Sequence, residues 1–319
     1  MDSVTQAVLG GALGELILGK KVGKKGAVLG AIVATIPDLD VIIIPFCNDL
    51  QKITVHRGYS HSILFSILGA VVIAFILSKI KFFKSISYSR LWIFSWLVLF
   101  THILLDAFTT YGTQLFLPLS DKRIGFDSIN IIDPFYTLPL LFGLIFALFS
   151  KYQNKGSFNT IGLISSTCYL LLTLGIKQIA NEKFETNLNK QGIENYDLLS
   201  VPVKIGGVNW YGVAKTRDSI YLGNFSFLEN HTPIHFESFP INDSLLNNNN
   251  LNPYLVNRLK WFSKGFYTVV KDNNKIRLYS LQVDMRGIKK IEKYKAPTIG
   301  FFEISFNADK SYKLQYKEH

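Results

Sequence analysis

The sequence contains little charge and little cysteine. Only 18% of its 319 residues are Asp, Glu, Lys or Arg, whereas soluble domains contain about 25%, and 48% of the residues are hydrophobic. This hydrophobic content also excludes a disordered chain, and the mean hydropathy of +0.22 agrees with that. Two cysteines, Cys47 and Cys168, are too few for a disulfide framework. The low charge together with the high hydrophobic content indicates a membrane protein, whereas the cysteines do not indicate a compartment.

The positive charge is not concentrated in one region. The formal net charge is +11, of which residues 1–180 carry +6 (15 Lys and Arg against 9 Asp and Glu) and residues 181–319 carry +5 (19 against 14). This even division argues against a single nucleic-acid patch, and we expect no nucleic-acid partner.

Six apolar segments occupy the first part of the chain. The longer ones approach the ~20 residues that a membrane-spanning helix needs, and the short first and fifth segments must be tilted, partly re-entrant or packed inside a bundle. We therefore predict a multi-pass, mainly α helical membrane domain over residues 1–180. The segments are 5–18, 27–46, 62–80, 91–108, 135–149 and 158–179.

Basic residues predict the orientation of these segments. Three alternating connections, at residues 20–25, 79–90 and 151–155, are rich in lysine and arginine and are expected on the cytoplasmic side. The connections at 48–61 and 109–133 contain fewer basic residues and are expected outside. With six crossings, the N-terminus and residues 181–319 would also be extracytoplasmic.

Residues 181–319 have a different pattern. Aromatic and β-branched runs between Gly, Asn and Asp predict antiparallel strands, residues 272–274 predict a hairpin turn, and residues 254–264 predict an amphipathic helix. We expect a soluble, β-rich or α+β extracytoplasmic domain. The predicted strands are 210–214, 220–227, 266–270, 276–283 and 300–306.

Two acidic residues interrupt the second apolar segment. Asp38 and Asp40 follow Pro37, which breaks a helix, and in an extended segment their side chains would point the same way and could share a cation. Carboxylates are costly inside apolar segments and by default mark function. Capping of a second half-helix explains one of the two but leaves the other unexplained.

Three histidines and a third carboxylate complete a candidate set. His56 and His61 flank the start of the third segment, and His102 and Asp106 have the i,i+4 spacing of one helix face. Each pair alone could be structural. The predicted topology, however, places both pairs at the same outer membrane level as the two acidic residues of the second segment. This agreement predicts one metal site, holding one ion or two, with donors that suit Zn, Mn or Fe.

The motifs together resemble a known family. The opening Met-Asp-Ser-Val-Thr-Gln, the Ile-Pro-Asp-Leu-Asp, the His-Arg-Gly-Tyr-Ser-His-Ser and the His-Ile-Leu-Leu-Asp are similar to those of the YdjM-like family of metal-dependent hydrolases. The resemblance covers about the first 180 residues and implies a multi-pass protein of the bacterial inner membrane. Gln6 stands where many members have His, and Asp133 belongs to a family Asp-Pro pair. The residues implied at the site are Asp38, Asp40, His56, His61, His102 and Asp106, with Gln6 and Asp133 added.

These residues predict a metal-dependent hydrolase, with zinc as the first choice of metal. Its substrate would be an amphiphilic ester, phosphoester or amide at the outer interface, so that membrane lipids are the expected partners. Whichever of the carboxylates Asp38, Asp40 and Asp106 is not a ligand would serve as the base, and Arg57 would bind a phosphate or carboxylate of the substrate. The alternatives are a divalent-ion or proton transporter, and a non-enzymatic membrane anchor with a structural metal.

Overall fold

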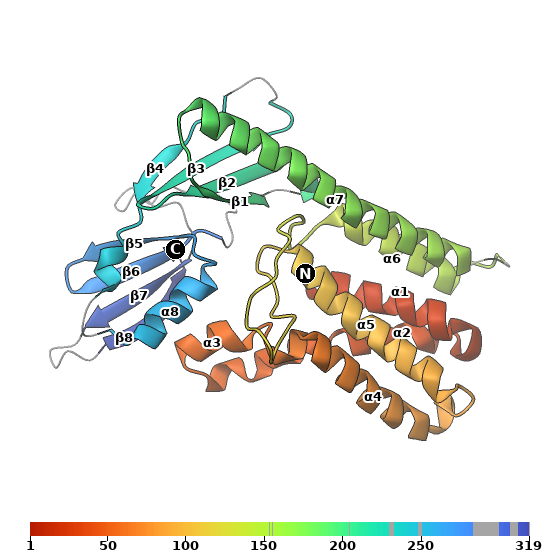
Figure 1. The fold of residues 1–319 in the computed structure, drawn as a ribbon. Coiled ribbons are helices and arrows are strands. Elements are labelled where there is room, and N and C mark those ends of the chain that lie inside the picture. Colours follow the sequence, from red (N-terminus) through yellow and green to blue (C-terminus); the bar gives the residue numbers. More distant parts are fainter. Residues whose placement is uncertain are drawn as a thin grey trace. The chain divides into compact units, whose positions relative to one another are not determined.

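The computed structural model divides into two compact units, and each is described by itself. Unit 1 comprises Met1–Pro45 and Val55–Leu174, and unit 2 comprises Phe46–Thr54 and Gly175–His319. Figure 1 shows helices in the first part of the chain and two sheets in the second. The structure describes residues 1–152, 154, 156–203, 205–229, 233–247, 251–282, 300–306 and 312–318.

Unit 1 is a helical bundle. Its helices are α1 (Ser3–Val22), α2 (Lys24–Ala34), α4 (Ile63–Lys79), α5 (Tyr88–Phe108), α6 (Pro134–Phe149) and the first half of α7 (Gly156–Lys190). Short 3-10 helices stand at the connections: η1 (Pro37–Ile42), η2 (Ile44–Phe46), η3 (Tyr59–His61) and η4 (Lys81–Phe83). The short helix α3 (Asp49–Val55) belongs to unit 2 up to Thr54.

The number of possible membrane crossings is smaller than the sequence predicts. By length and composition, α5 and α7 could each span a membrane. Two bent pairs, α2 with Pro37–Phe46 and Asp49–His61 with α4, raise the number to four if each counts as one span, and α6 is a shorter apolar helix. The helical N-terminal part is therefore confirmed, whereas six crossings are not.

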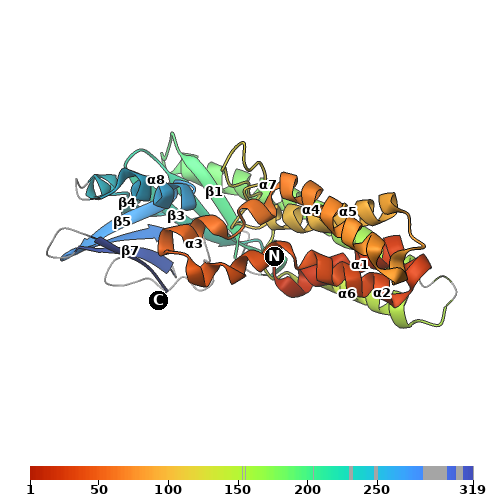
Figure 2. The same cartoon turned by 90° about the horizontal axis from the view of Figure 1, so that it is seen from below.

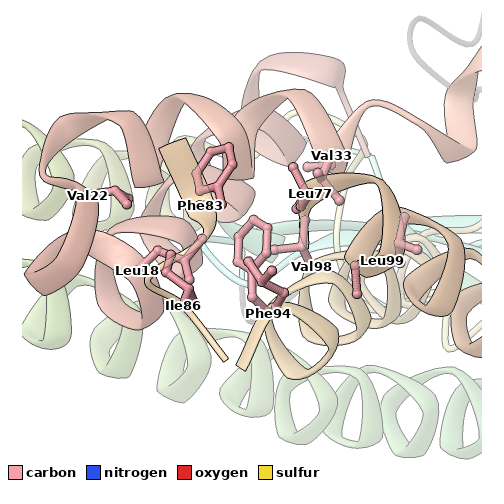
Figure 3. Close-up of a cluster of buried hydrophobic side chains, with 12 residues drawn as sticks. Leu18, Val22, Val33, Leu77, Phe83, Ile86, Phe94, Val98 and Leu99 are labelled. Carbon is pink, nitrogen blue, oxygen red and sulfur yellow. The ribbon is translucent and has the colours of Figure 1, made fainter. Parts of the chain in front are cut away.

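The core of the bundle is a cluster of apolar side chains from α1, α2, α4, α5 and the α4–α5 connection (Figure 3). The outer face of α4 instead exposes large apolar side chains, including Leu68 and Phe75. An apolar face of this kind suits a lipid environment better than water. The labelled core residues are Leu18, Val22, Val33, Leu77, Phe83, Ile86, Phe94, Val98 and Leu99.

Glycines bring α1 and α2 into backbone contact. A Cβ added to Gly30 would lie 2.0 Å from the carbonyl oxygen of Gly10, and one added to Gly14 would lie 2.1 Å from that of Gly26. Only glycine fits such an approach, which is the usual reason for small residues at helix interfaces in membranes. The pair thereby fixes the start of α1 beside the end of α2, where the candidate site begins.

The basic connections at 20–25 and 79–90 and the end of α6 lie at one end of the bundle, and η1 with the 109–133 loop lies at the other (Figures 1 and 2). Lys24 at the start of α2 lies 4.1 Å from the ring centroid of Phe149 at the end of α6. Lys25 lies 4.0 Å from that of Phe82, in the α4–α5 connection. Lysines of the first connection thus contact the second connection and the end of α6, and Lys155 is outside the described residues.

Unit 2 contains two antiparallel sheets, each preceded along the chain by a helix. The first has the order β1-β2-β3-β4 and follows α7, and the second has the order β5-β6-β7-β8 and follows α8 (Pro253–Phe262). Phe184 of α7 packs with Trp210 and Phe225 of the first sheet. The strands are β1 (Asp197–Pro202), β2 (Asn209–Lys215), β3 (Ser219–Ser226), β4 (Glu237–Pro240), β5 (Tyr267–Asp272), β6 (Lys275–Ser280), β7 (Gly300–Phe306) and β8 (Tyr312–Glu318).

The prediction of an antiparallel, β-rich C-terminal part is confirmed. Each of the five predicted strands falls on a strand, and Asn273, at the predicted hairpin turn, has a φ of +52° between β5 and β6. The helix predicted over 254–264 is α8. Three strands, β1, β4 and β8, were not predicted, and Val283, the end of the predicted fourth strand, is outside the described residues.

The close contact between Gly10 and Gly30 predicts that one added methyl group lowers the stability of the bundle. Gly30→Ala should lower the free energy of unfolding by about 1–3 kcal/mol, because the added Cβ overlaps the Gly10 carbonyl and the helices must separate. The thermal unfolding midpoint of the detergent-purified protein measures this. Gly175→Ala on α7 is the control, since a Cβ there meets nothing within 4 Å. Equal midpoints for the two variants would contradict the contact.

Glu303 predicts an acid-sensitive step in unit 2. Burial alone would raise its pKa, but hydrogen bonds from Lys317, Lys275 and Arg277 lower the pKa from 4.5 to about 2. The resulting stability is complete above about pH 4.5 and is lost as the pH falls toward 2. Glu303→Gln should therefore cost about 1–3 kcal/mol at neutral pH and progressively less in acid. Thermal melts of both proteins across this pH range test it; a pH-independent difference would refute the assignment.

Candidate metal centre

The acidic pair of the second segment lies on a 3-10 helix. Pro37 begins η1 shortly after α2 ends, and Asp38 and Asp40 both lie in this single helix. The extended geometry expected from the sequence is therefore wrong, and the two carboxylates do not point the same way. Asp38 faces His61 and His102, whereas Asp40 faces His56.

Four side chains from three elements converge at one point. Asp38, His61, His102 and Asp106 each offer a ligand atom, and these four atoms lie within 4.8 Å of one another. The Nε2 atom of His61 is 3.4 Å from Asp38 Oδ1 and 3.2 Å from Asp106 Oδ2. The Nε2 atom of His102 is 3.5 and 3.7 Å from the same two oxygens. Ligand atoms of a tetrahedral zinc site with bonds of ~2.0–2.1 Å would be about 3.3 Å apart, so the spacing fits such an ion.

The ligand atoms are buried and lack other partners. Nε2 of His61, Nε2 of His102 and Oδ2 of Asp106 have no hydrogen-bond partner among the described residues. These three residues are at most 1% exposed, whereas the side chain of Asp38 is 25% exposed. Buried polar atoms are nearly always satisfied, and a cation between these four groups would satisfy them. The residues present therefore fit a metal ion.

Ser60 and Asp40 set the orientation of His61. Its Nδ1 atom is 3.0 Å from the Ser60 hydroxyl and 3.5 Å from Asp40 Oδ2. Asp40 is itself held by the backbone N–H of Arg57 at 2.9 Å and by the Ser60 hydroxyl at 3.0 Å. Because Ser60 and Asp40 occupy Nδ1, Nε2 faces the cluster. Metal-binding histidines are commonly oriented in this way, by a hydrogen bond to the nitrogen that does not bind the metal.

Asp106 uses its two oxygens differently. While Oδ2 faces the histidines, Oδ1 accepts a hydrogen bond from the Gln6 side-chain amide at 3.1 Å and lies 3.3 Å from Nη2 of Arg57. The amino group of Met1 also donates to Oδ1. The Gln6 amide further contacts the carbonyl oxygen of His102 at 3.2 Å. Gln6 and Arg57 thus support the ligand helix α5 through Asp106.

Arg57 is held in an unusual backbone conformation. It has a φ of +56°, and its Nη1 atom donates to the Thr109 hydroxyl at 2.9 Å. Its guanidinium also lies 5.1 Å from the ring centroid of Tyr111. A left-handed backbone is rare for a residue other than Gly and is maintained only by its surroundings. This conformation lets the backbone N–H of Arg57 bind Asp40 while its guanidinium lies beside Asp106.

The predicted residues therefore fall into three groups. Asp38, His61, His102 and Asp106 form the cluster, Asp40 with His56 forms a neighbouring couple at 3.1 Å, and Gln6 and Arg57 contact Asp106. Asp133 lies elsewhere: it caps α6 through the N–H of Phe135 and accepts from the Tyr169 hydroxyl at 2.8 Å. Sequence reasoning did not single out Ser60, Thr109 or Tyr111, although Ser60 lies between the paired histidines.

Comparison with known sequences identifies the family of this chain. The family described as "YdjM inner membrane protein" matches residues 1–182, more than half of the chain, and this range contains the whole cluster. The chain belongs to the YdjM family. The resemblance seen in the sequence is thereby confirmed, and the family name with the apolar helices supports an inner-membrane location for this YdjM protein.

Two relatives share parts of this YdjM chain. The uncharacterized protein YfhP of Bacillus subtilis is 34% identical over 142 residues, which are 42% of each chain. The inner membrane protein YbcI of Escherichia coli is 33% identical over 96 residues, 30% of this chain and 54% of its own. The matches thus span less than two thirds of either relative. No solved structure matches this YdjM protein.

Asp133 offers a test that separates structure from metal binding. Asp133→Ala should lower the free energy of unfolding by about 1–2 kcal/mol, because it removes the cap of α6 and the partner of Tyr169. Its metal content should remain that of the unchanged protein, since Asp133 is not in the cluster. Thermal melts and elemental analysis of the same preparation provide both values. Loss of the metal from a folded variant would place Asp133 in the centre.

Proposed function

We propose that this chain is a zinc-dependent hydrolase of the inner membrane. Its substrate is an amphiphilic ester, phosphoester or amide at the outer membrane interface. The observation that carries the proposal is the cluster itself: three buried ligand atoms without partners and a fourth, partly exposed carboxylate. Two imidazoles and two carboxylates suit zinc, with Mn or Fe as alternatives, and no thiolate is present to suggest a purely structural site.

The residues around the cluster have distinct roles in the proposed reaction. When bound, the metal would lower the pKa of a water molecule toward ~7 and polarise the substrate oxygen. Asp38 turns Oδ1 to both histidines, which leaves Oδ2 to accept the proton of the attacking water. Asp40 keeps His61 oriented, and Arg57 neutralises Oδ1 of Asp106 and contributes positive charge beside the substrate.

The outer face is the proposed location of the centre. The basic connections gather at one end of unit 1 and the site lies toward the other end, so the positive-inside rule supports a site on the outer side. In this arrangement a membrane domain of residues 1–180 carries the chemistry. Residues 181–319 form an extracytoplasmic domain, and membrane lipids are the natural partners.

Transport of a divalent ion or of protons is the second candidate. One observation favours it. Glu15 of α1 accepts a hydrogen bond at 2.6 Å from the buried Asn159 of α7 and would provide a second polar group within the bundle. An ion pathway needs such groups away from the cluster. A membrane anchor whose metal only fixes helix packing is the third candidate, and chelation would then unfold the bundle.

Metal content is the primary test. The detergent-purified protein should hold one divalent ion per chain, and His61→Ala and His102→Ala should each lose most of it, because each removes a buried ligand. His56→Gln is the matched control and should retain the ion, since His56 faces Asp40 instead of the cluster. Full metal content in both alanine variants would overturn the centre.

Activity separates the three candidates. The metal-loaded protein should release products from a panel of lipid esters, phosphoesters and amides, and Asp38→Asn should reduce the rate by about 10²-fold or more, because it removes a carboxylate ligand together with the proposed base. Metal-dependent ion flux in proteoliposomes that Glu15→Gln abolishes, without hydrolysis, would favour the transporter. Unfolding upon chelation, with neither activity, would favour the anchor.

A further inference from the structure

We propose that the substrate is a lipid of the bilayer and that it enters the metal centre sideways from the membrane, across the outer face of η1. This inference rests on the proposed hydrolase function and specifies its substrate class and route of entry. Three observations carry it: which ligand is exposed, which side chains surround that ligand, and how a second apolar segment is tied to the ligand loop.

Asp38 marks the open side of the centre. His61, His102 and Asp106 are enclosed by the bundle, so a substrate cannot approach past them. The carboxylate of Asp38 is a quarter exposed and is therefore the ligand that a substrate meets first. Access to the metal is decided by the surface of η1, the short helix that carries Asp38.

The surface of η1 is apolar. Leu39, Val41 and Ile42 are each about half exposed or more, and Ile43 directly after the helix is equally exposed. The inner face of the same helix carries the buried Asp40. A helix with one buried and one partly buried carboxylate and with large aliphatic side chains turned outward is unsuited to water, but it suits the boundary between head groups and acyl chains.

A second apolar segment is tied to the ligand loop. The backbone N–H of Ile63, two residues after His61, donates to the carbonyl oxygen of Leu115 at 2.9 Å. Directly after Leu115, the chain exposes half of Phe116 and 93% of Leu119. Both segments that hold the outer edge of the centre, η1 and the 115–119 loop, thus expose large apolar side chains.

The bilayer is the occupant that this surface fits. Pro37–Phe46, which contains η1, joins α2 in a bent pair that is long and apolar enough for one membrane span, so its apolar surface continues that of a candidate span. A water-soluble substrate without acyl chains would make no favourable apolar contacts with such a surface. A lipid already lying in the bilayer would have its polar group at the level of Asp38 with its acyl chains against Leu39 and Ile42.

Spin labels test the immersion of this surface without any hydrolysis assay. In a full chain carrying Cys47→Ser and Cys168→Ser, single cysteines replace Ile42, Ile43 or Leu119, and the labelled proteins are placed in vesicles of phosphatidylethanolamine and phosphatidylglycerol. Their labels should be more accessible to oxygen than to a water-soluble nickel chelate, as at Leu68 on the outer face of α4. Lys122→Cys, in the same loop as Leu119, is the aqueous reference. Water-like accessibility at Ile42 and Ile43 would overturn the proposal.

Ile42→Lys tests the route of entry. It should leave the metal content unchanged and reduce hydrolysis of phosphatidylglycerol in vesicles at least about tenfold, because a charge is placed on the path of the lipid. Hydrolysis of a short-chain, water-soluble phosphatidylglycerol should fall much less, because that substrate reaches the centre without crossing the bilayer, and Lys122→Ala is the matched control. Equal loss on both substrates would contradict lateral entry. Membrane-immersed labels combined with a metal-loaded protein that hydrolyses neither lipid would instead refute the hydrolase function.

Discussion

The buried carboxylate of Asp106 is the contact on which the rest of the centre depends. Its two oxygens join α5 to four other groups: Oδ2 faces His61, and Oδ1 is held by Gln6, Arg57 and the amino group of Met1. A carboxylate enclosed in this way would be strongly unfavourable without such partners. The positions of α1, the Arg57 loop and η3 are therefore tied to a single side chain, and the metal site forms at their junction.

The sequence predicted which residues belong to the site, but it did not predict which of them form the cluster and which only support it. Charged groups in apolar segments are rare enough to be informative, and an i,i+4 spacing places His102 and Asp106 on one helix face whatever surrounds them. The roles of Asp38 and Asp40 could not be separated in this way, because that depends on whether the segment after Pro37 is extended or a 3-10 helix. A break in a helix predicts an irregular segment but not its type.

Tertiary contacts explain what the sequence did not predict about the fold. The apolar runs coincide with helices because hydrophobic content is a local property, whereas the number that crosses a membrane depends on bends such as the one between α2 and η1. Strand β4, with only four residues, pairs with β3 and has little pattern of its own. The close pairing of Gly10 with Gly30 is likewise visible only once α1 and α2 are side by side.

The four residues of the cluster lie between positions 38 and 106, and their supporting contacts from Gln6, Arg57 and Thr109 also lie before position 110. All residues of the candidate site are therefore synthesised before α6. Because N-terminal parts fold first during synthesis, the proposed metal ion could bind before the C-terminal part of the chain is translated.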